Sequence, residues 1–495
     1  MKTLKINCLL TAVFSLGLTL TVHAQTTHYI AHEWGTFTSL CGSDGIPLHG
    51  LYVEEEPLPV FVHNLGGSFP KLPYDFGKGT PVNVALSNVS IKMETPVIYF
   101  YSKDAFNVDV KVQFTHGLIG QWYPDDSAGV SSMYYNSFGP NLDFGNKQAP
   151  ISNFLQWNAK VLPTNTDPNS VLKYGETHTW TAPRATDANI VLAKGENEKF
   201  LFYRGIGNFD LPVNLSFDKK ANLVIQNNYP VSIPYFFVYD KEDNGDVKVW
   251  FAGPISANAS KTVSQQQTIL SAEAFNNKLS EFQAALTAAG LYDKESAAML
   301  NTWTTSYFGK SGLRVFWIVP RNVTDGILPL TLNPAPDDIQ RVLVGRSEIM
   351  TPQQEQKLYN YYKQDNAMPQ FASDRFIEAY KERMAFLDTH KDALQEINDM
   401  VVASGIATPI GPVPSMVLYP NPAQTNLSIT LENTERGNVS LILTDMSGRL
   451  LLDLHDNING AFYQKSLDIS HLSNGIYYLH VQTNKEDYTS RLIKN

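Results

Sequence analysis

The sequence predicts an α+β protein, with a β-rich main domain that carries helical insertions and a small antiparallel β-sandwich after it. Aromatic and β-branched runs recur between turn signals from residue 25 to about residue 263. Helical spacing begins only after that point, and a proline-containing stretch at 406–416 precedes a third, strand-like region. The 495 residues are enough for two to four domains at about 100–200 residues each.

Composition excludes some classes of function. Lys and Arg number 38 against 48 Asp and Glu, which gives a formal net charge of −10, and charged residues make up only 17% of the chain. Nucleic-acid affinity depends on Lys and Arg that neutralise phosphates, so a nucleic-acid partner is not expected.

The first 24 residues have the pattern of a secretory signal peptide. Lys2 and Lys5 precede an apolar run over 9–22, and cleavage is expected after Ala24. This run is shorter than the roughly 20 residues of a membrane span, and no later segment reaches that length, so we expect no transmembrane segment in the mature chain. Cys41 is then the one remaining cysteine; we expect no internal disulfide and a small buried thiol.

The main domain is expected over 25–405, and its elements follow from local patterns. Two strand-like runs flank Asp243-Asn244-Gly245-Asp246, which predicts a β-hairpin. Apolar residues from Phe275 to Leu286 recur at helical spacing before Gly290, and Thr351-Pro352 is typical of a helix start. Ser373 is expected to cap a further helix, and 313–319 reads as a buried strand that contains Trp317.

His32 and Glu33 are the first candidate site residues. His28 lies four residues before His32, which makes a metal site with His28 and His32 as ligands one interpretation. The zinc-protease pattern needs a second His three residues after the Glu, and Thr36 stands there instead. The alternative is a hydrogen-bonded polar residue at a strand edge, with His32 on the same face as Trp34.

Charged residues at the ends of apolar strands form a second candidate set. Glu94 heads such a strand and Arg204 ends another, and His116 lies between two strand-like runs. Such residues converge on a catalytic site in some proteins and form structural ion pairs in others. The run 54–56, three consecutive Glu, is expected to be a solvated loop.

Aromatic residues suggest a possible ligand platform. Trp122, Tyr123 and Trp157 are the candidates for stacking against sugar rings, although core packing is the commoner use of such residues. No nucleophile elbow, phosphate-binding loop, dinucleotide fingerprint or CxxC pair is present in the sequence. Paired carboxylates from distant strands leave no local motif, so hydrolysis by acids stays open and the cofactor stays unknown.

Short alternating runs separated by turns characterise residues 417–495. Apolar and polar residues alternate from Leu427 to Leu431, from Val439 to Leu443 and from Tyr477 to Val481. Within this region Tyr419, Pro420, Asn421 and Pro422 come first, Asp445, Gly448 and Arg449 follow, and Gly475 and Tyr477 come near the end.

These motifs, in this order and next to a signal peptide, resemble the type A sorting domain of Bacteroidetes type IX secretion cargo. The resemblance implies export across the inner membrane, passage through the outer membrane by the type IX machinery, and release or attachment at the cell surface. It implies nothing about the activity of the cargo.

The main domain resembles a set of secreted proteins of unassigned function. The opening His32 to Ser39 motif, the strand from Glu94 to Tyr101 and the Trp122-Tyr123-Pro124 turn carry this resemblance. No activity follows from it, and two functions stay open. The favoured one is an extracellular binding module for a polymer, a surface glycan or another partner. The alternative is a secreted hydrolase or lyase, metal-assisted or not, with His32, Glu33, Glu94, His116 and Arg204 as its first residues to test.

Overall fold

The computed structural model describes most of the chain after residue 26. It covers residues 27–55, 58–64, 84–85, 88–125, 142–143, 153–172, 179–251, 253–264, 268–365, 374–404, 415–432, 436–445, 449–460, 462–484 and 487–494. The predicted signal peptide and most of the proline-containing stretch lie outside these residues.

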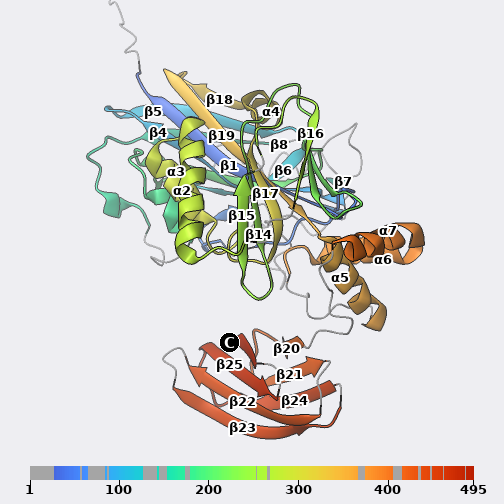
Figure 1. The fold of residues 1–495 in the computed structure, drawn as a ribbon. Coiled ribbons are helices and arrows are strands. Elements are labelled where there is room, and N and C mark those ends of the chain that lie inside the picture. The colour runs from blue at the N-terminus through green and yellow to red at the C-terminus, as the bar shows by residue number, and fades with distance from the viewer. Residues whose placement is uncertain are drawn as a thin grey trace, which may run out of the picture.

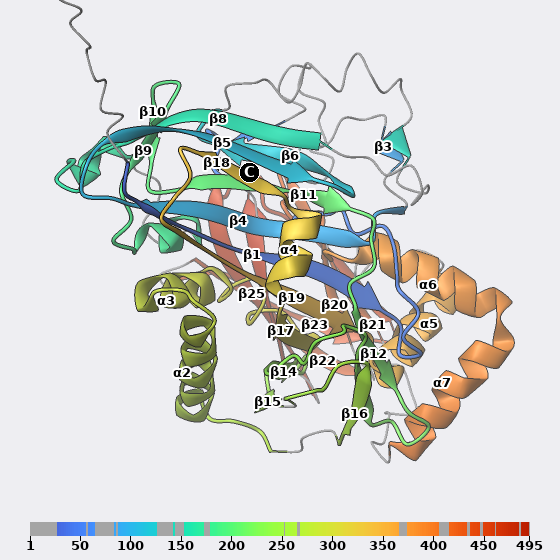
Figure 2. The same ribbon diagram turned by 90° about the horizontal axis from the view of Figure 1, so that it is seen from above.

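The main domain is built around a nine-stranded mixed sheet, which Figure 2 shows from above. Its strands, in spatial order, are β15 (Val247–Phe251), β14 (Phe236–Lys241), β17 (Gly312–Ile318), β19 (Asp338–Ile349), β1 (Ile30–Cys41), β4 (Ile91–Tyr101), β11 (Leu201–Gly207), β6 (Gly117–Tyr123) and β2 (His63–Asn64). β1 runs parallel to β19 and antiparallel to β4. β1, the first strand of the described chain, is therefore central, because the later strands β4 and β19 pair with it on its two sides.

Smaller sheets cover one face of this sheet. Five strands form the first, in the order β10 (Glu196–Glu198), β9 (Val191–Ala193), β8 (Asn153–Val161), β5 (Phe106–Phe114) and β18 (Leu330–Asn333). Three form the second, in the order β12 (Val213–Phe217), β13 (Leu223–Asn227) and β16 (Ala259–Val263). The short strands β3 (Val84–Ala85) and β7 (Leu142–Asp143) pair with each other.

Helices gather in two groups, which Figure 1 shows on different parts of the sheet. The first group is α2 (Ala272–Ala288) and α3 (Asp293–Thr302), near the 3-10 helix η4 (Thr179–Arg184). The second is α5 (Pro352–Asp365), α6 (Ile377–Thr389) and α7 (Lys391–Ala403). The short helices η3 (Pro168–Ser170) and α4 (Arg321–Ile327) lie in connections.

The two faces of the large sheet have separate apolar cores. The core between one face, the smaller sheets and α5–α7 includes Met93 and Trp317 of the large sheet and Trp157 of β8. The core between the other face and α2 and α3 includes Trp34 and Val97 of the large sheet and Trp303, which follows α3. This arrangement of a sheet between two layers explains why its strands read as nearly continuous apolar runs.

Several sequence predictions in the main domain are confirmed. β14 and β15 form the expected hairpin, and β17 is the expected buried strand, with a fully buried Trp317. α5 begins at Pro352, and the Thr351 hydroxyl accepts a hydrogen bond from the Gln354 N–H. Ser373 lies outside the described residues, so its capping role stays a prediction.

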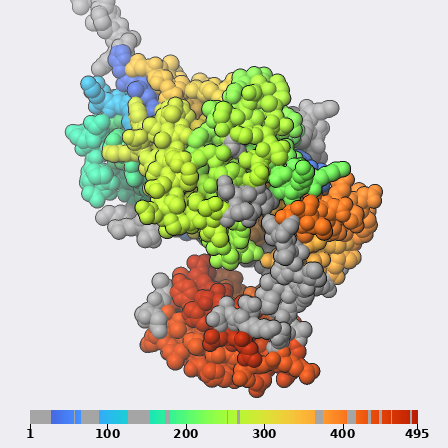
Figure 3. Space-filling view, in the orientation of Figure 1, coloured from blue at the N-terminus to red at the C-terminus, as the bar shows by residue number. Residues whose placement is uncertain are grey.

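The C-terminal module consists of two antiparallel sheets. One has the order β20 (Ser415–Tyr419), β21 (Asn426–Glu432), β24 (Phe462–Asp468), and the other β23 (Leu450–Ile458), β22 (Gly437–Asp445), β25 (Gly475–Thr483), β26 (Asp487–Lys494). The alternating apolar residues predicted from Leu427 to Val481 are buried in one shared core, which includes no residue of the main domain. In Figure 3 the module is coloured red-orange and is distinct from the main body.

Two further observations concern export and redox chemistry. Among the described residues no helix is long and apolar enough to cross a membrane. Cys41 is a free cysteine, and its Sγ lies 3.6 Å from the carbonyl oxygens of Leu215 and Glu348. Cys41 is half-buried, and burial raises the pKa of this thiol above its ordinary value, with Asp44 and Glu355 adding to the effect, which favours the protonated form.

Candidate functional site

Strand β4 of the large sheet contains a β-bulge at Thr95. Thr95 has a φ of +47°, which is an outlier for a β-branched residue. The register of β4 against β1 shifts between Trp34 and Thr36, and its register against β11 shifts between Phe202 and Gly205. Both neighbours therefore accommodate one extra residue in β4, which is the definition of a bulge.

The bulge changes which face the side chains of β4 occupy. Ile91 and Met93 lie in the core under the smaller sheets, and without a bulge the odd-numbered Val97 would lie there too. Val97 and Tyr99 instead lie in the core under α2 and α3. Gly35 permits this, since a Cβ at that position would lie 2.9 Å from Pro96 Cα. Strain of about 1–3 kcal/mol persists only where surrounding structure enforces it, and such outliers cluster at functional sites.

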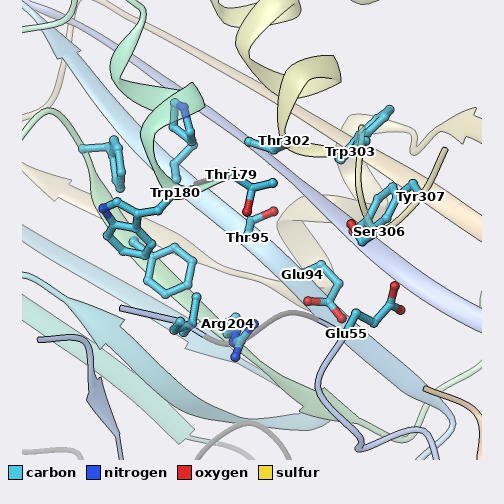
Figure 4. A pocket seen from close by; sticks show the side chains of 15 residues that line it. Glu55, Glu94, Thr95, Thr179, Trp180, Arg204, Thr302, Trp303, Ser306 and Tyr307 are labelled. Carbon is cyan, nitrogen blue, oxygen red and sulfur yellow. The ribbon is translucent and has the colours of Figure 1, made fainter. Parts of the chain in front are cut away.

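A cavity of about 60 Å³ lies over the bulge, between the sheet, η4 and the residues that follow α3. Figure 4 shows Glu94, Thr95 and Arg204 at its floor, Trp180 on one side, and Trp303, Ser306 and Tyr307 on the other. The remaining lining residues are Glu55, Leu58, Val97, Thr179, Pro183, Phe200, Phe202 and Thr302. One water needs about 10–15 Å³ of such a volume, so the cavity has room for about four to six water-sized groups.

Arg204 is held in place at the cavity. Its Nε donates a hydrogen bond to the Gln121 side-chain oxygen, and its Nη2 donates to Glu54 Oε1 at 2.6 Å. The Arg204 side chain is buried, at 3% exposure, and that of Glu54 is only 19% exposed. The guanidinium therefore has a fixed orientation and a compensating charge.

Glu55 connects the cavity to a buried ionic cluster. Its carboxylate accepts two hydrogen bonds from Arg346, at 3.0 and 3.1 Å, and lies 3.5 Å from Lys92 Nζ. Arg346 also bonds Glu348, to which Arg375 donates at 2.9 Å. The expectation that 54–56 is a solvated loop is wrong for Glu54 and Glu55, because buried guanidinium groups take both carboxylates out of solvent; Glu56 lies outside the described residues.

Protonation in this cluster follows from two opposing effects. Burial raises the pKa of Glu55, but the charges of Arg346, Lys92 and Arg375 outweigh it and hold the pKa well below its ordinary value. Burial lowers the pKa of Lys92, and the nearby Glu55 and Glu94 offset only part of that effect. Glu55 is therefore a permanent anion, unsuited to donate a proton.

Aromatic rings form the walls of the cavity. Trp180 packs edge-on against Phe202 with ring centroids 4.8 Å apart, and Trp303 stacks on Tyr307 at 5.3 Å. Trp303 is 1% exposed, and its indole N–H has no hydrogen-bond partner among the described residues. A buried donor of this kind is one that a ligand oxygen or a bound water can satisfy.

His32 lies in a different cluster, under the start of α3. Its Nδ1 is 2.7 Å from Glu295 Oε2, and Tyr101 donates to the other oxygen of Glu295 at 2.7 Å. The Tyr292 ring lies over the imidazole at a centroid distance of 4.4 Å. His32 is 2% exposed and belongs to a central strand, so the strand-edge placement is wrong, although its polar group does have a partner.

Glu33 is buried in a third cluster. It accepts hydrogen bonds from the Tyr203 hydroxyl at 2.5 Å and from Arg341 Nε at 2.5 Å. Arg341 also bonds Asp325 and the Leu328 carbonyl, which ties β19 to α4. This arrangement is a closed ion-pair network of the kind that fixes a fold.

The other predicted residues do not join the cavity. His116 lies in the turn between β5 and β6, and its carbonyl accepts the Asn208 N–H. Trp122, Tyr123 and Trp157 are buried, at no more than 5% exposure, and so form no exposed platform. His28 pairs with Asp337 at 3.2 Å, and the described part of the chain contains no group of three His, Cys, Asp or Glu arranged to hold a metal.

Of the predicted catalytic residues, the structure brings Glu94 and Arg204 together. Five further lining residues were not predicted as site residues from the sequence: Glu55, Thr95, Thr302, Ser306 and Tyr307. One signal was available, because Pro96 stands inside an apolar strand, where proline indicates an edge or a bulge.

The motif residues of the C-terminal module have structural partners. The Asn421 amide donates to the Arg491 carbonyl at 2.7 Å, and its oxygen accepts the Ile493 N–H at 2.9 Å. Arg449 bonds the Asp445 carboxylate at 3.0 Å, and the Tyr477 hydroxyl donates to Ser473. The first motif is thus attached to the last strand of the chain; Gly448 lies outside the described residues.

Comparison with protein families identifies this module. Residues 417–495 match the family described as the secretion system C-terminal sorting domain. The match confirms the type IX sorting assignment and the secretion of the chain to the cell surface or the extracellular space. No curated protein matches the chain.

Solved structures give only remote likenesses. Dimeric latent PorU from Porphyromonas gingivalis has 7% identity and a TM-score of 0.15, over 81% of this chain and 31% of that one. A tetra-tandem repeat of a large adhesion protein has 11% identity and a TM-score of 0.14, over 94% of this chain and 75% of that one. The chain thus spans about a third of the PorU chain, and TM-scores this low support no functional comparison.

Proposed function

We propose that the main domain, residues 25–405, is an extracellular binding module that a type IX signal exports, and that its ligand is a polymer or surface glycan. The observation that supports this most is the cavity at the Thr95 bulge. There a strained strand brings carboxylate, guanidinium, hydroxyl and aromatic groups to one place. Ligand sites in proteins combine apolar walls with a few fixed polar groups in this way.

The size of the cavity defines the mode of binding. With room for about four to six water-sized groups, the cavity takes a short part of the polymer while the rest of the polymer chain stays outside. The hydroxyls of Thr95, Thr179, Thr302 and Ser306 and the indole N–H of Trp303 supply donors and acceptors for this part of the polymer.

Binding of the mature chain to a panel of insoluble polysaccharides tests this proposal. Glu94→Gln and Ser306→Ala should each lower the bound fraction for the polysaccharide that the wild type retains. Asp104→Asn is the matched control, since Asp104 is an exposed carboxylate in the β4–β5 turn, outside the cavity lining. Equal retention of all four proteins would contradict the proposed site.

The same experiment separates binding from hydrolysis. Release of new reducing ends by the wild type, lost in Glu94→Gln, would favour the hydrolase instead. Glu94 is the residue varied in this comparison because it lines the cavity, whereas the charges of Arg346, Lys92 and Arg375 hold Glu55 as an anion.

A further inference from the structure

We propose that the outer face of the four-stranded sheet in the sorting domain is the surface that the secretion machinery binds, and that this partner presents an apolar surface next to a carboxylate. The inference concerns residues 417–495 and does not depend on the binding function proposed for the main domain. It rests on the strand registers, the exposure of the side chains and the family match of this module.

The strand registers place one row of side chains across all four strands of this sheet. Leu450 of β23 pairs with Thr444 of β22. Thr444 pairs in turn with Tyr478 of β25, and Tyr478 pairs with Arg491 of β26. Paired residues have their side chains on the same face of a sheet. Leu450 is 55% exposed, Tyr478 is 37% exposed and Arg491 is also exposed, so this row lies on the outer face.

Three isoleucines extend the row along the strands. Ile476 and Ile493 pair with each other, two positions farther along β25 and β26, and Ile442 lies two positions before the row on β22. Each of the three is half-buried, and none belongs to the core of the module. We call the set of Ile442, Leu450, Ile476, Tyr478 and Ile493 the outer patch.

The outer face of the three-stranded sheet differs from this patch. In its middle Thr430 of β21 pairs with Gln464 of β24, and both side chains are polar. Its exposed aromatic residues, Tyr419 of β20 and Phe462 of β24, belong to the two opposite edge strands. Apolar residues that are exposed singly are normal on protein surfaces, whereas contiguous exposed patches mark interaction sites. The outer patch is therefore the face of the module that we expect a partner to cover.

The sequence motifs of the sorting domain contribute directly to the outer patch. Tyr477 and Leu492 lie in the core of the module. Their neighbours Ile476, Tyr478 and Ile493 point outward, because side chains alternate along a strand. A partner can contact only the outward set. Since the family match makes the secretion machinery the partner of this module, the machinery is the occupant that we assign to the patch.

Arg491 indicates the chemistry of that partner at the border of the patch. Its side chain is exposed and has no ion-pair partner among the residues that the structure describes. Arg449, also at this end of the module, is bonded to Asp445 and so has its counter-charge within the chain. A guanidinium beside an aromatic residue at an interface is suited to bind a carboxylate of the partner.

Binding of the full mature chain to outer-membrane vesicles tests this assignment. The vesicles come from a type IX-competent strain and, for comparison, from a strain without the machinery. Tyr478→Ser should raise Kd for the first vesicles at least about tenfold, because aromatic residues in an interface carry a large share of the binding energy. Phe462→Ser is the matched control, since Phe462 is more exposed than Tyr478 but lies on the other outer face, and it should change Kd less than about twofold.

A second variant tests the charge. Arg491→Glu should also raise Kd at least about tenfold, while Arg491→Lys should stay within about threefold of the wild type. Because the Arg491 side chain is exposed, this pair remains informative even if Tyr478→Ser folds poorly. In the competent strain, the precursors with Tyr478→Ser and Arg491→Glu should accumulate in the periplasm, and the precursor with Phe462→Ser should be exported like the wild type.

Equal Kd values for the wild type, Tyr478→Ser and Arg491→Glu would overturn the assignment. Equal binding of the wild type to both kinds of vesicle would also overturn it, as would a loss in Phe462→Ser as large as that in Tyr478→Ser. A wild-type dimer that Tyr478→Ser dissociates, with export unchanged, would make a second copy of this chain the occupant of the patch instead of the machinery.

Discussion

Replacement of Trp317 by alanine tests how the main domain is stabilised. Trp317 is fully buried in β17, and its indole N–H donates to the Ser347 hydroxyl at 3.2 Å. Truncation of a buried Trp to Ala costs about 3–5 kcal/mol. No disulfide within the main domain offsets this loss, since Cys41 is the one cysteine after residue 24.

The expected change in melting temperature follows from the size of the domain. About 380 residues at about 2.1 cal/mol/K each give an unfolding entropy of about 0.8 kcal/mol/K, so about 4 kcal/mol lowers Tm by about 5 °C. The assay can use the whole mature chain. All 7 tryptophans precede residue 318, so tryptophan fluorescence follows the main domain and not the sorting domain.

A double-mutant cycle makes this prediction sharper. A Cβ at Gly345, the neighbour of Trp317 on β19, would lie 2.2 Å from Trp317 Cε2. Gly345→Ala alone should therefore destabilise by about 1–3 kcal/mol through overpacking. In the Trp317→Ala background the clash disappears, and Gly345→Ala should cost almost nothing. An unchanged Tm in Trp317→Ala, or strictly additive effects in the double variant, would refute this account of the core.

Four further outcomes are expected. Deletion of 417–495 should leave the main domain folded but retained in the periplasm of a type IX-competent host, and its appearance in the medium would contradict the role of the sorting domain. Thr95→Gly should keep or raise Tm, because the release of about 1–3 kcal/mol of backbone strain offsets the entropy cost of glycine. The same variant should bind the retained polysaccharide more weakly than the wild type. A clear fall in Tm would contradict the presence of strain at Thr95. Burial raises the pKa of Glu348, but the charges of Arg314, Arg346 and Arg375 outweigh burial and hold the pKa at about 2, below its ordinary value of 4.5. The stability that ionised Glu348 contributes is therefore complete above about pH 4.5 and is lost as the pH falls toward 2. Denaturant titrations over this range should show a smaller loss in Glu348→Gln than in the wild type. Added reductant and Cys41→Ser should shift Tm far less than Trp317→Ala, and a shift of similar size would indicate that the thiol has a structural role beyond packing.

The sequence alone determined the parts of this protein whose signals are local. The alternation of apolar and polar residues from Leu427 to Val481, with the ordered motifs between Tyr419 and Tyr477, was sufficient to predict the sorting domain. Each of these sequence patterns spans fewer than ten residues, so it does not depend on distant parts of the chain. The same holds for the hairpin at Asn244-Gly245 and for the buried strand around Trp317, where turn chemistry and continuous apolar character act over one element.

Only the tertiary structure decided which charged residues meet. Glu33, Glu94 and Arg204 look alike in the sequence, as polar residues in apolar strands, yet Glu33 is part of a closed ion-pair network with Arg341, some 300 residues away in the chain. The prediction that Glu55 lies in a solvated loop was wrong because its partners Arg346 and Arg375 come from distant segments of the chain. No local sequence pattern indicates such pairing. The site at Thr95 depends on one extra residue in β4, and that residue changes the face of every later side chain of the strand. The bulge depends on the registers of β1, β4 and β11 together. The side chains that it brings to one cavity could therefore be identified only from the pairing of these three strands.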